Sequence, residues 1–63
     1  MNPATKYRKG DRVRLVNHRY AGATGTVHYV YANWDYGIVR VQVQFDGADM
    51  PVDGYSEYEL ELL

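Results

Sequence analysis

The sequence contains no cysteine, which excludes disulfide bridges and thiolate metal ligands as sources of stability. No apolar run approaches the roughly 18 residues that a membrane-spanning helix needs, and the first ten residues lack the apolar stretch of a secretory signal. These absences predict a soluble, cytoplasmic protein. Cations are also absent after residue 40, where only acidic charges follow.

The residues that are present predict one small domain that folds on its own. The chain has 63 residues, and its 46% hydrophobic and 14% aromatic content is too high for a disordered chain. Residues 1–40 carry seven cations against Asp11 and Asp35, a net charge of +5, whereas residues 41–63 carry a net charge of -6. This asymmetry indicates either a nucleic-acid-binding face or two halves that neutralise each other.

The hydrophobic pattern predicts an all-β chain, because no segment repeats apolar residues at helical spacing over three turns. Alternation and β-branched residues predict five strands, at residues 11–16, 25–31, 38–45, 50–52 and 59–63, with a 3₁₀ turn starting at Ser56. The Asp–Gly pairs at 46–47 and 53–54 predict turns. Gly22 is expected at a positive φ and Gly25 at a crowded corner. Five such short strands remove their exposed edges most economically by curling into a small barrel.

A glycine and an acid, an alternating strand, a loop, and a glycine before spaced valines together resemble the KOW type of SH3-like barrel. The residues that carry this resemblance are Gly10, Asp11, Val13, Leu15, Gly22, Gly25, Val27 and Val30. It implies a small five-stranded SH3-like barrel over residues 9–63, preceded by an N-terminal arm at residues 1–8. KOW-type barrels contact RNA, the ribosome or RNA polymerase, so the resemblance implies a similar partner. The layout is also similar to the SH3-like peripheral subunit of photosystem I.

The first and last strands of an SH3-like barrel are neighbours, so we expect Arg12 and Arg14 to lie opposite Glu59 and Glu61. Exposed pairs of this kind contribute roughly 0.2–1 kcal/mol each. The remaining cations of the arm and first loop are expected at one end of the barrel, beside two loop aromatics. They form the predicted nucleic-acid-binding set: Lys6, Arg8, Lys9, Arg19, Tyr20 and Trp34.

The aromatic residues are too many for a core of this size, so several are expected at the surface. Exposed rings stack on unpaired bases or bind peptides, or they only stiffen the sheet. Tyr20, Trp34 and Tyr36 are the predicted protein-binding residues, and Phe45 is expected in the core. The remaining tyrosines with a predicted packing role are Tyr29, Tyr31, Tyr55 and Tyr58. Tyr29 and Tyr31 share one face of the predicted strand while Val30 faces the other, so either the tyrosines line the outside or a bulge rearranges them.

The sequence offers no constellation for catalysis or metal binding, and we expect no cofactor. His18 and His28 are isolated surface histidines, and three carboxylates around turns are expected to bond local backbone. We therefore predict a monomeric, non-enzymatic binding module that contacts RNA or a nucleoprotein complex. The alternative is a docking subunit or small inhibitor that uses its aromatic loops or acidic C-terminal half against a protein. A third class, an oligomeric enzyme whose pore is built from several barrels, requires a defined oligomer.

Overall fold

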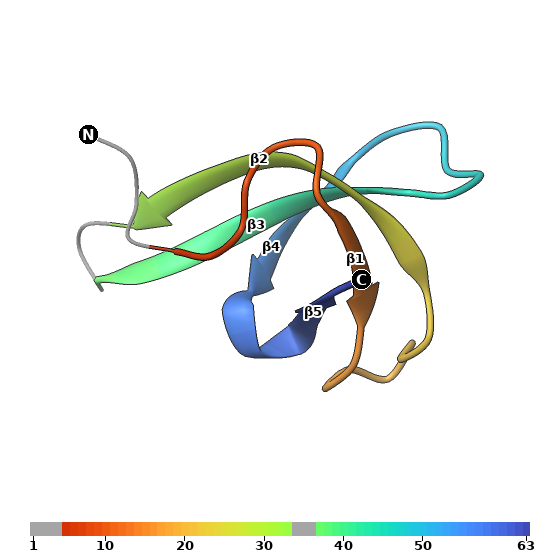
Figure 1. Cartoon of the computed structure of the whole chain (residues 1–63), viewed down its shortest axis with the longest axis horizontal. Coiled ribbons are helices and arrows are strands. Elements are labelled where there is room, and N and C mark those ends of the chain that lie inside the picture. Colours follow the sequence, from red (N-terminus) through yellow and green to blue (C-terminus); the bar gives the residue numbers. More distant parts are fainter. Residues whose placement is uncertain (1–4, 34–36) are drawn as a thin grey trace.

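Five antiparallel β-strands form one sheet in the computed structural model, which describes residues 5–33 and 37–63 (Figure 1). The strands are β1 (Arg12–Leu15), β2 (Thr24–Asn33), β3 (Ile38–Phe45), β4 (Val52–Ser56) and β5 (Leu60–Leu62). A 3₁₀ turn, η1 (Glu57–Glu59), precedes the last strand. The all-β class and the turn before β5 are therefore confirmed.

The strand order β4-β3-β2-β1-β5 places the first strand of the chain beside the last. β1 pairs with β5 in antiparallel register, with Arg14 opposite Glu61 and Leu15 opposite Leu60. This confirms the predicted adjacency of the first and last strands, which Figure 1 shows as the C-terminus lying next to β1. β4 and β5 stand at the two ends of the order, and residues 37–63 contain no ladder between them. Closure into a barrel stays a prediction.

The core lies on the inner face of the sheet. Its buried residues are Tyr7, Val13, Leu15, Val27, Val41, Val43 and Leu60, with Val30, Phe45 and Tyr55 packed against them. Phe45 is thus part of the apolar interior, as expected, although it is only partly buried. Leu62, which the alternation of the last strand predicts to face inward, lies opposite the buried Val13 on the core side of the sheet but is not covered there. It is 42% exposed, because the short edge strand β5 has only β1 as a ladder partner.

Two glycines have the roles that the sequence predicted. Gly22, in the loop between β1 and β2, has a φ of 104°, a conformation that side chains other than glycine rarely adopt. Gly25 lies where β2 crosses close to β3. A Cβ atom there would stand 2.6 Å from the Gln44 carbonyl oxygen and 2.9 Å from the Phe45 Cα. Gly25 therefore allows the backbones of β2 and β3 to approach at this corner.

A β-bulge in β2 decides which side chains face the core. Val27 pairs with Val43 and Tyr29 pairs with Gln42, so His28 is an extra residue with no partner on β3. Val30 then pairs with the buried Val41 and packs against the core. The bulge is why the run after His28 presents its valine inward and its tyrosines outward.

The strand expected at residues 50–52 is wrong in its bounds, because β4 runs from Val52 to Ser56. The second Asp–Gly pair lies inside this strand and is not a turn between elements. Val43 pairs with Val52 and Val41 with Tyr55, which leaves one extra residue on β4. Gly54 has a φ of 97°, so the Asp53–Gly54 pair is used to form a bulge.

Candidate binding surfaces

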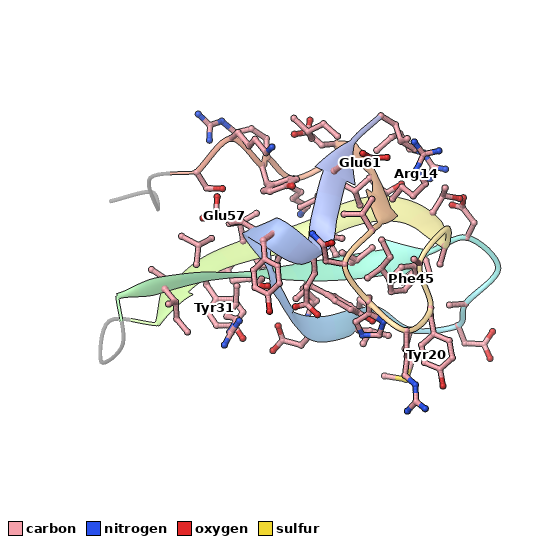
Figure 2. All side chains as sticks on the ribbon, turned by 90° about the horizontal axis from the view of Figure 1, so that it is seen from below. Arg14, Tyr20, Tyr31, Phe45, Glu57 and Glu61 are labelled. Atoms are coloured by element: carbon pink, nitrogen blue, oxygen red, sulfur yellow. The ribbon has the colours of Figure 1, made fainter. Side chains whose placement is uncertain are left out.

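Arg14 forms the ion pair that its position on β1 predicts. Its Nε atom donates a hydrogen bond to Glu61 Oε1 at 2.7 Å, across the β1–β5 ladder (Figure 2). Both side chains are about half exposed, with side-chain exposures of 46% and 43%. Solvent screens such a pair, so it helps to align the strand ends but contributes little stability. The positive charge of Arg14 is thereby neutralised locally.

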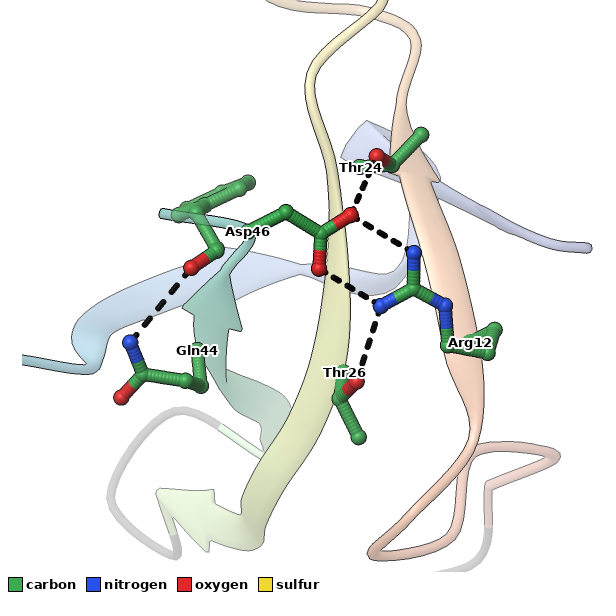
Figure 3. Close-up of polar contacts among 6 residues, drawn as sticks. Arg12, Thr24, Thr26, Gln44 and Asp46 are labelled. Atoms are coloured by element: carbon green, nitrogen blue, oxygen red, sulfur yellow. Dashed lines mark hydrogen bonds and ion pairs between the residues drawn. The ribbon is translucent and has the colours of Figure 1, made fainter. Parts of the chain in front are cut away.

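Arg12 pairs with a different carboxylate from the one expected. Its two terminal nitrogens donate to the two Asp46 oxygens, each at 2.7 Å, and Nη1 also donates to Thr26 Oγ1 at 3.0 Å (Figure 3). Thr24 Oγ1 donates to Asp46 Oδ2 at 2.7 Å. The hydrogen bonds from Arg12, and secondarily from Thr24, hold the pKa of the Asp46 carboxyl well below its ordinary value. This network ties β1 and β2 to the end of β3.

The expectation that Arg12 lies opposite one of the two glutamates, Glu59 or Glu61, is wrong, and Glu59 has another role. Its carboxylate accepts hydrogen bonds from the backbone N–H and the hydroxyl of Ser56, both at 2.9 Å, at the start of η1. The backbone hydrogen bond from Ser56 is the main reason that the pKa of Glu59 lies below its usual range. The register of β5 also places Leu63, not Glu59, beside Arg12, since the Leu63 N–H donates to the Arg12 carbonyl.

The four remaining cations of the predicted nucleic-acid set do not form one patch. Lys6, Arg8 and Lys9 precede β1, whereas Arg19 lies in the loop that follows it, and Figure 1 shows these segments at opposite ends of β1. All four side chains are exposed. Arg8 donates to the Thr5 carbonyl at 3.0 Å, and Lys6 Nζ lies 5.4 Å from the centre of the Tyr7 ring. The expectation that arm and loop share one end of the fold is therefore wrong.

Tyr20 is the one predicted aromatic site residue within the described part of the chain, and it is 66% exposed. Trp34 and Tyr36 lie outside the described residues. Tyr20 borders an open apolar hollow of about 180 Å³ between the β1–β2 loop and β4. The residues that line this hollow are Leu15, Tyr20, Ala23, Phe45, Val52 and Tyr55. The structure therefore places Tyr20 beside partly buried residues that sequence reasoning had assigned only to the core or to packing.

Aromatic rings form a continuous wall at this hollow. The His18 ring lies 5.7 Å from the ring of Tyr20 and 5.7 Å from that of Tyr55, and Phe45 meets Tyr55 edge to face at 5.5 Å. Figure 2 shows Tyr20 at the outer end of this group and Phe45 nearer the sheet. His18 Nδ1 also accepts the Tyr20 N–H at 3.2 Å, which orients the loop. Burial, with a smaller effect of Glu59, raises the pKa of Tyr55.

Of the two charged groups described near the hollow, one is free to bind a ligand and the other is already hydrogen-bonded within the protein. The Arg19 guanidinium lies 5.6 Å from the centre of the Tyr20 ring and is exposed. Glu59, which is near enough to His18 to interact electrostatically, is held by Ser56. Val52, which lines the hollow from β4, exposes 43% of its surface. The rim therefore combines apolar side chains with one accessible cation.

Tyr7 is a structural residue that sequence reasoning missed. It lies in the segment assigned to the N-terminal arm, yet it is only 1% exposed. Its hydroxyl donates to the Leu60 carbonyl at 2.8 Å and also lies 3.1 Å from the Glu57 carbonyl. Thr5 Oγ1 donates to Glu57 Oε2 at 2.6 Å. These contacts fix residues 5–7 against η1 and β5.

Comparisons of the chain with family models, with curated proteins and with solved structures find no match. Across residues 5–33 and 37–63, no group of three or more His, Asp or Glu side chains is arranged to hold a metal ion. The same residues include no helix long and apolar enough to cross a membrane.

Proposed function

We propose that this protein is a non-enzymatic, cytoplasmic binding module that docks a segment of another protein in the apolar hollow. The observation that carries this proposal is the hollow itself, open to solvent and walled by Tyr20, Phe45 and Tyr55. Its volume of about 180 Å³ exceeds the ~150 Å³ cavity that accommodates benzene in an engineered protein. One ring-sized or branched apolar side chain of a partner fits such a space.

The occupant we propose is an extended acidic segment with one apolar side chain beside a carboxylate. Tyr20 and Val52 line the hollow and are exposed, and burying apolar surface of this kind is the usual core of an interface. The exposed Arg19 guanidinium on the Tyr20 ring supplies a planar, bidentate donor for the carboxylate. Arginine and tyrosine are also the residue types that most often dominate binding energy.

Selection of a displayed peptide library against the purified protein tests this proposal. We expect the enriched peptides to combine an aliphatic or aromatic residue with a neighbouring Asp or Glu. Val52→Lys places a charge at the hollow and should weaken their binding about ten- to hundredfold, the effect of losing one buried apolar side chain. Ile38→Lys is the matched control, since Ile38 is similarly exposed but lies at the other end of β3. Equal binding by both variants, or no enriched peptide, would contradict the proposal.

The KOW-type SH3-like identity belongs to the same proposal. Its support is the strand order, the 3₁₀ turn before β5, and the close packing of Gly25 against β3. A monomer is proposed with it, and sedimentation checks that state. The RNA or nucleoprotein contact predicted from loop cations is less well supported, because Lys9 and Arg19 lie at opposite ends of β1. A titration with single-stranded RNA and duplex DNA tests it, and binding unaffected by Arg19→Ala would contradict it.

A further inference from the structure

The outer face of the sheet, opposite the core, carries a pair of tyrosines outside the hollow, of which one is exposed and the other, Tyr31, is partly buried. Tyr29 and Tyr31 lie two residues apart on β2, with nearly parallel rings inclined at 25° and ring centres 6.2 Å apart. Tyr29 is 57% exposed. We infer that these rings, with Arg40 and Gln42, form a platform on which unpaired bases of single-stranded nucleic acid stack. This site is separate from the proposed protein-docking hollow.

The β2 bulge creates the platform. If the alternation that sets Val27 inward continued through His28, Tyr29 and Tyr31 would enter the core. The extra residue reverses the alternation, so both rings emerge on the solvent side. Bulges often re-aim side chains in this way at functional positions. Two large aromatic side chains are thus presented outward from a rigid, fully paired strand region.

Hydrogen-bonding side chains accompany each ring. Gln42 lies directly across the ladder from Tyr29, and Arg40 lies directly across from Tyr31. An amide beside an aromatic ring reaches the hydrogen-bonding edge of a stacked base, and a guanidinium binds phosphate or stacks on a base. Two neighbouring cross-strand pairs therefore each combine a stacking surface with a polar group. That is the combination on which proteins commonly recognise single-stranded RNA.

The Tyr31 ring is held in place before any ligand arrives. Its hydroxyl donates to Asp53 Oδ2 at 2.9 Å, a contact from β2 to β4 that spans β3 (Figure 2 labels Tyr31). This hydrogen bond is the main cause of the raised pKa of Tyr31. A fixed ring loses little conformational freedom when a base stacks on it, so binding energy is not spent on ordering.

The charge and chemistry of this face favour nucleic acid over protein. Beyond the two rings, the outward residues beside them on β2 and β3 are polar, namely Thr26, Gln42 and Gln44, and the exposed apolar Ile38 stands at the start of β3. A polar surround of this kind is unlike the apolar centre of a protein interface. The Asp46 carboxylate on this side is neutralised by Arg12, and Asp53 is engaged by Tyr31 and by the Gly54 N–H. Arg40 therefore supplies a cation beside the rings, on a face where Asp46 is paired with Arg12 and Asp53 keeps its charge but accepts hydrogen bonds from neutral donors.

Fluorescence anisotropy with short labelled oligouridine and oligodeoxythymidine tests the inference at low and moderate salt. We expect saturable binding that Tyr29→Ala weakens about five- to hundredfold, the effect of losing one base-stacking ring. Tyr29→Phe keeps the ring and should keep the affinity. Arg40→Gln should lower the dependence of log affinity on log salt by about 0.7, the value for one phosphate contact on a single strand.

Matched variants separate this site from the others. Tyr58→Ala removes a tyrosine that is 70% exposed in η1 and should not change the affinity. Val52→Lys should weaken peptide docking but leave oligonucleotide binding unchanged, so the two proposals fail independently. Circular dichroism verifies that each variant is folded. Absence of saturable binding, or binding that Arg19→Ala weakens and Tyr29→Ala does not, overturns the inference.

Discussion

The buried phenol of Tyr7 should stabilise the whole fold, although it lies in a segment that looks like a flexible arm. The ring is only 1% exposed and belongs to the same cluster as Val13 and Leu60. Tyr7→Phe removes the donor to the Leu60 and Glu57 carbonyls and should lower the free energy of unfolding by about 1–2 kcal/mol. Tyr7→Ala also opens a cavity and should cost about 3–5 kcal/mol, as truncation of a buried aromatic residue does.

Those costs are large for so short a chain. A domain of this size typically has an unfolding free energy of about 3–9 kcal/mol, so Tyr7→Ala should leave much of the protein unfolded. Tyr7→Phe is the quantitative variant, and thermal unfolding should show its midpoint falling by roughly 4–8 °C per kcal/mol lost. Tyr58→Phe is the control, because that tyrosine is 70% exposed. A surface substitution usually changes the free energy of unfolding by no more than about 0.5 kcal/mol. If Tyr7→Ala has so small an effect, the residues before β1 are a free arm and our reasoning fails.

Two substitutions and one deletion test the sheet itself. Gly25→Ala should destabilise the fold by about 1–3 kcal/mol in urea unfolding, because its Cβ would meet the Gln44 carbonyl oxygen at 2.6 Å. The Asp46 carboxylate, whose pKa is lowered by Arg12, stabilises the fold fully above its unfolded pKa of about 3.9 and loses this effect as pH falls further. Asp46→Asn should therefore flatten the acid side of the stability profile. Deletion of His28 removes the unpaired residue of the bulge and should cost no more than about 1 kcal/mol, with tyrosine exposure retained in solvent-perturbation spectra.

The parts of the fold that were predictable from sequence are those where local pattern and pairing agree. β3 occupies residues 38–45 as predicted, because four inward apolar residues alternate there without interruption. The adjacency of β1 and β5 was expected from the resemblance to an SH3-like barrel, and the opposite charges that this adjacency brings together do pair at Arg14 and Glu61. The same reasoning failed for Arg12, because the sequence offers several carboxylates as partners. Only the strand register shows that Asp46 is the one that accepts its hydrogen bonds.

The bulge in β4, the burial of Tyr7 and the hollow could not be predicted, because no local sequence pattern marks them. An Asp–Gly pair suits a hairpin turn and a bulge equally, because both use a glycine with positive φ, and Gly54 uses it inside β4. Tyr7 is a single aromatic residue in a polar segment, so no periodicity marks it as buried. The hollow joins Leu15, Tyr20 and Val52, which are distant in sequence and meet only when the loop after β1 folds over the start of β4.

The bulge at His28 connects the stability of this small protein with the use of its surface. Among residues 5–33 and 37–63 the core has seven buried hydrophobic residues, which leaves little room for two more tyrosine rings, so continued alternation through β2 would overpack it. The extra residue instead gives Val30 to the core and both rings to solvent. The hollow and the tyrosine platform consequently lie on opposite faces and share no side chain. Ligands at the two sites are therefore coupled only through the stability of the sheet that both require.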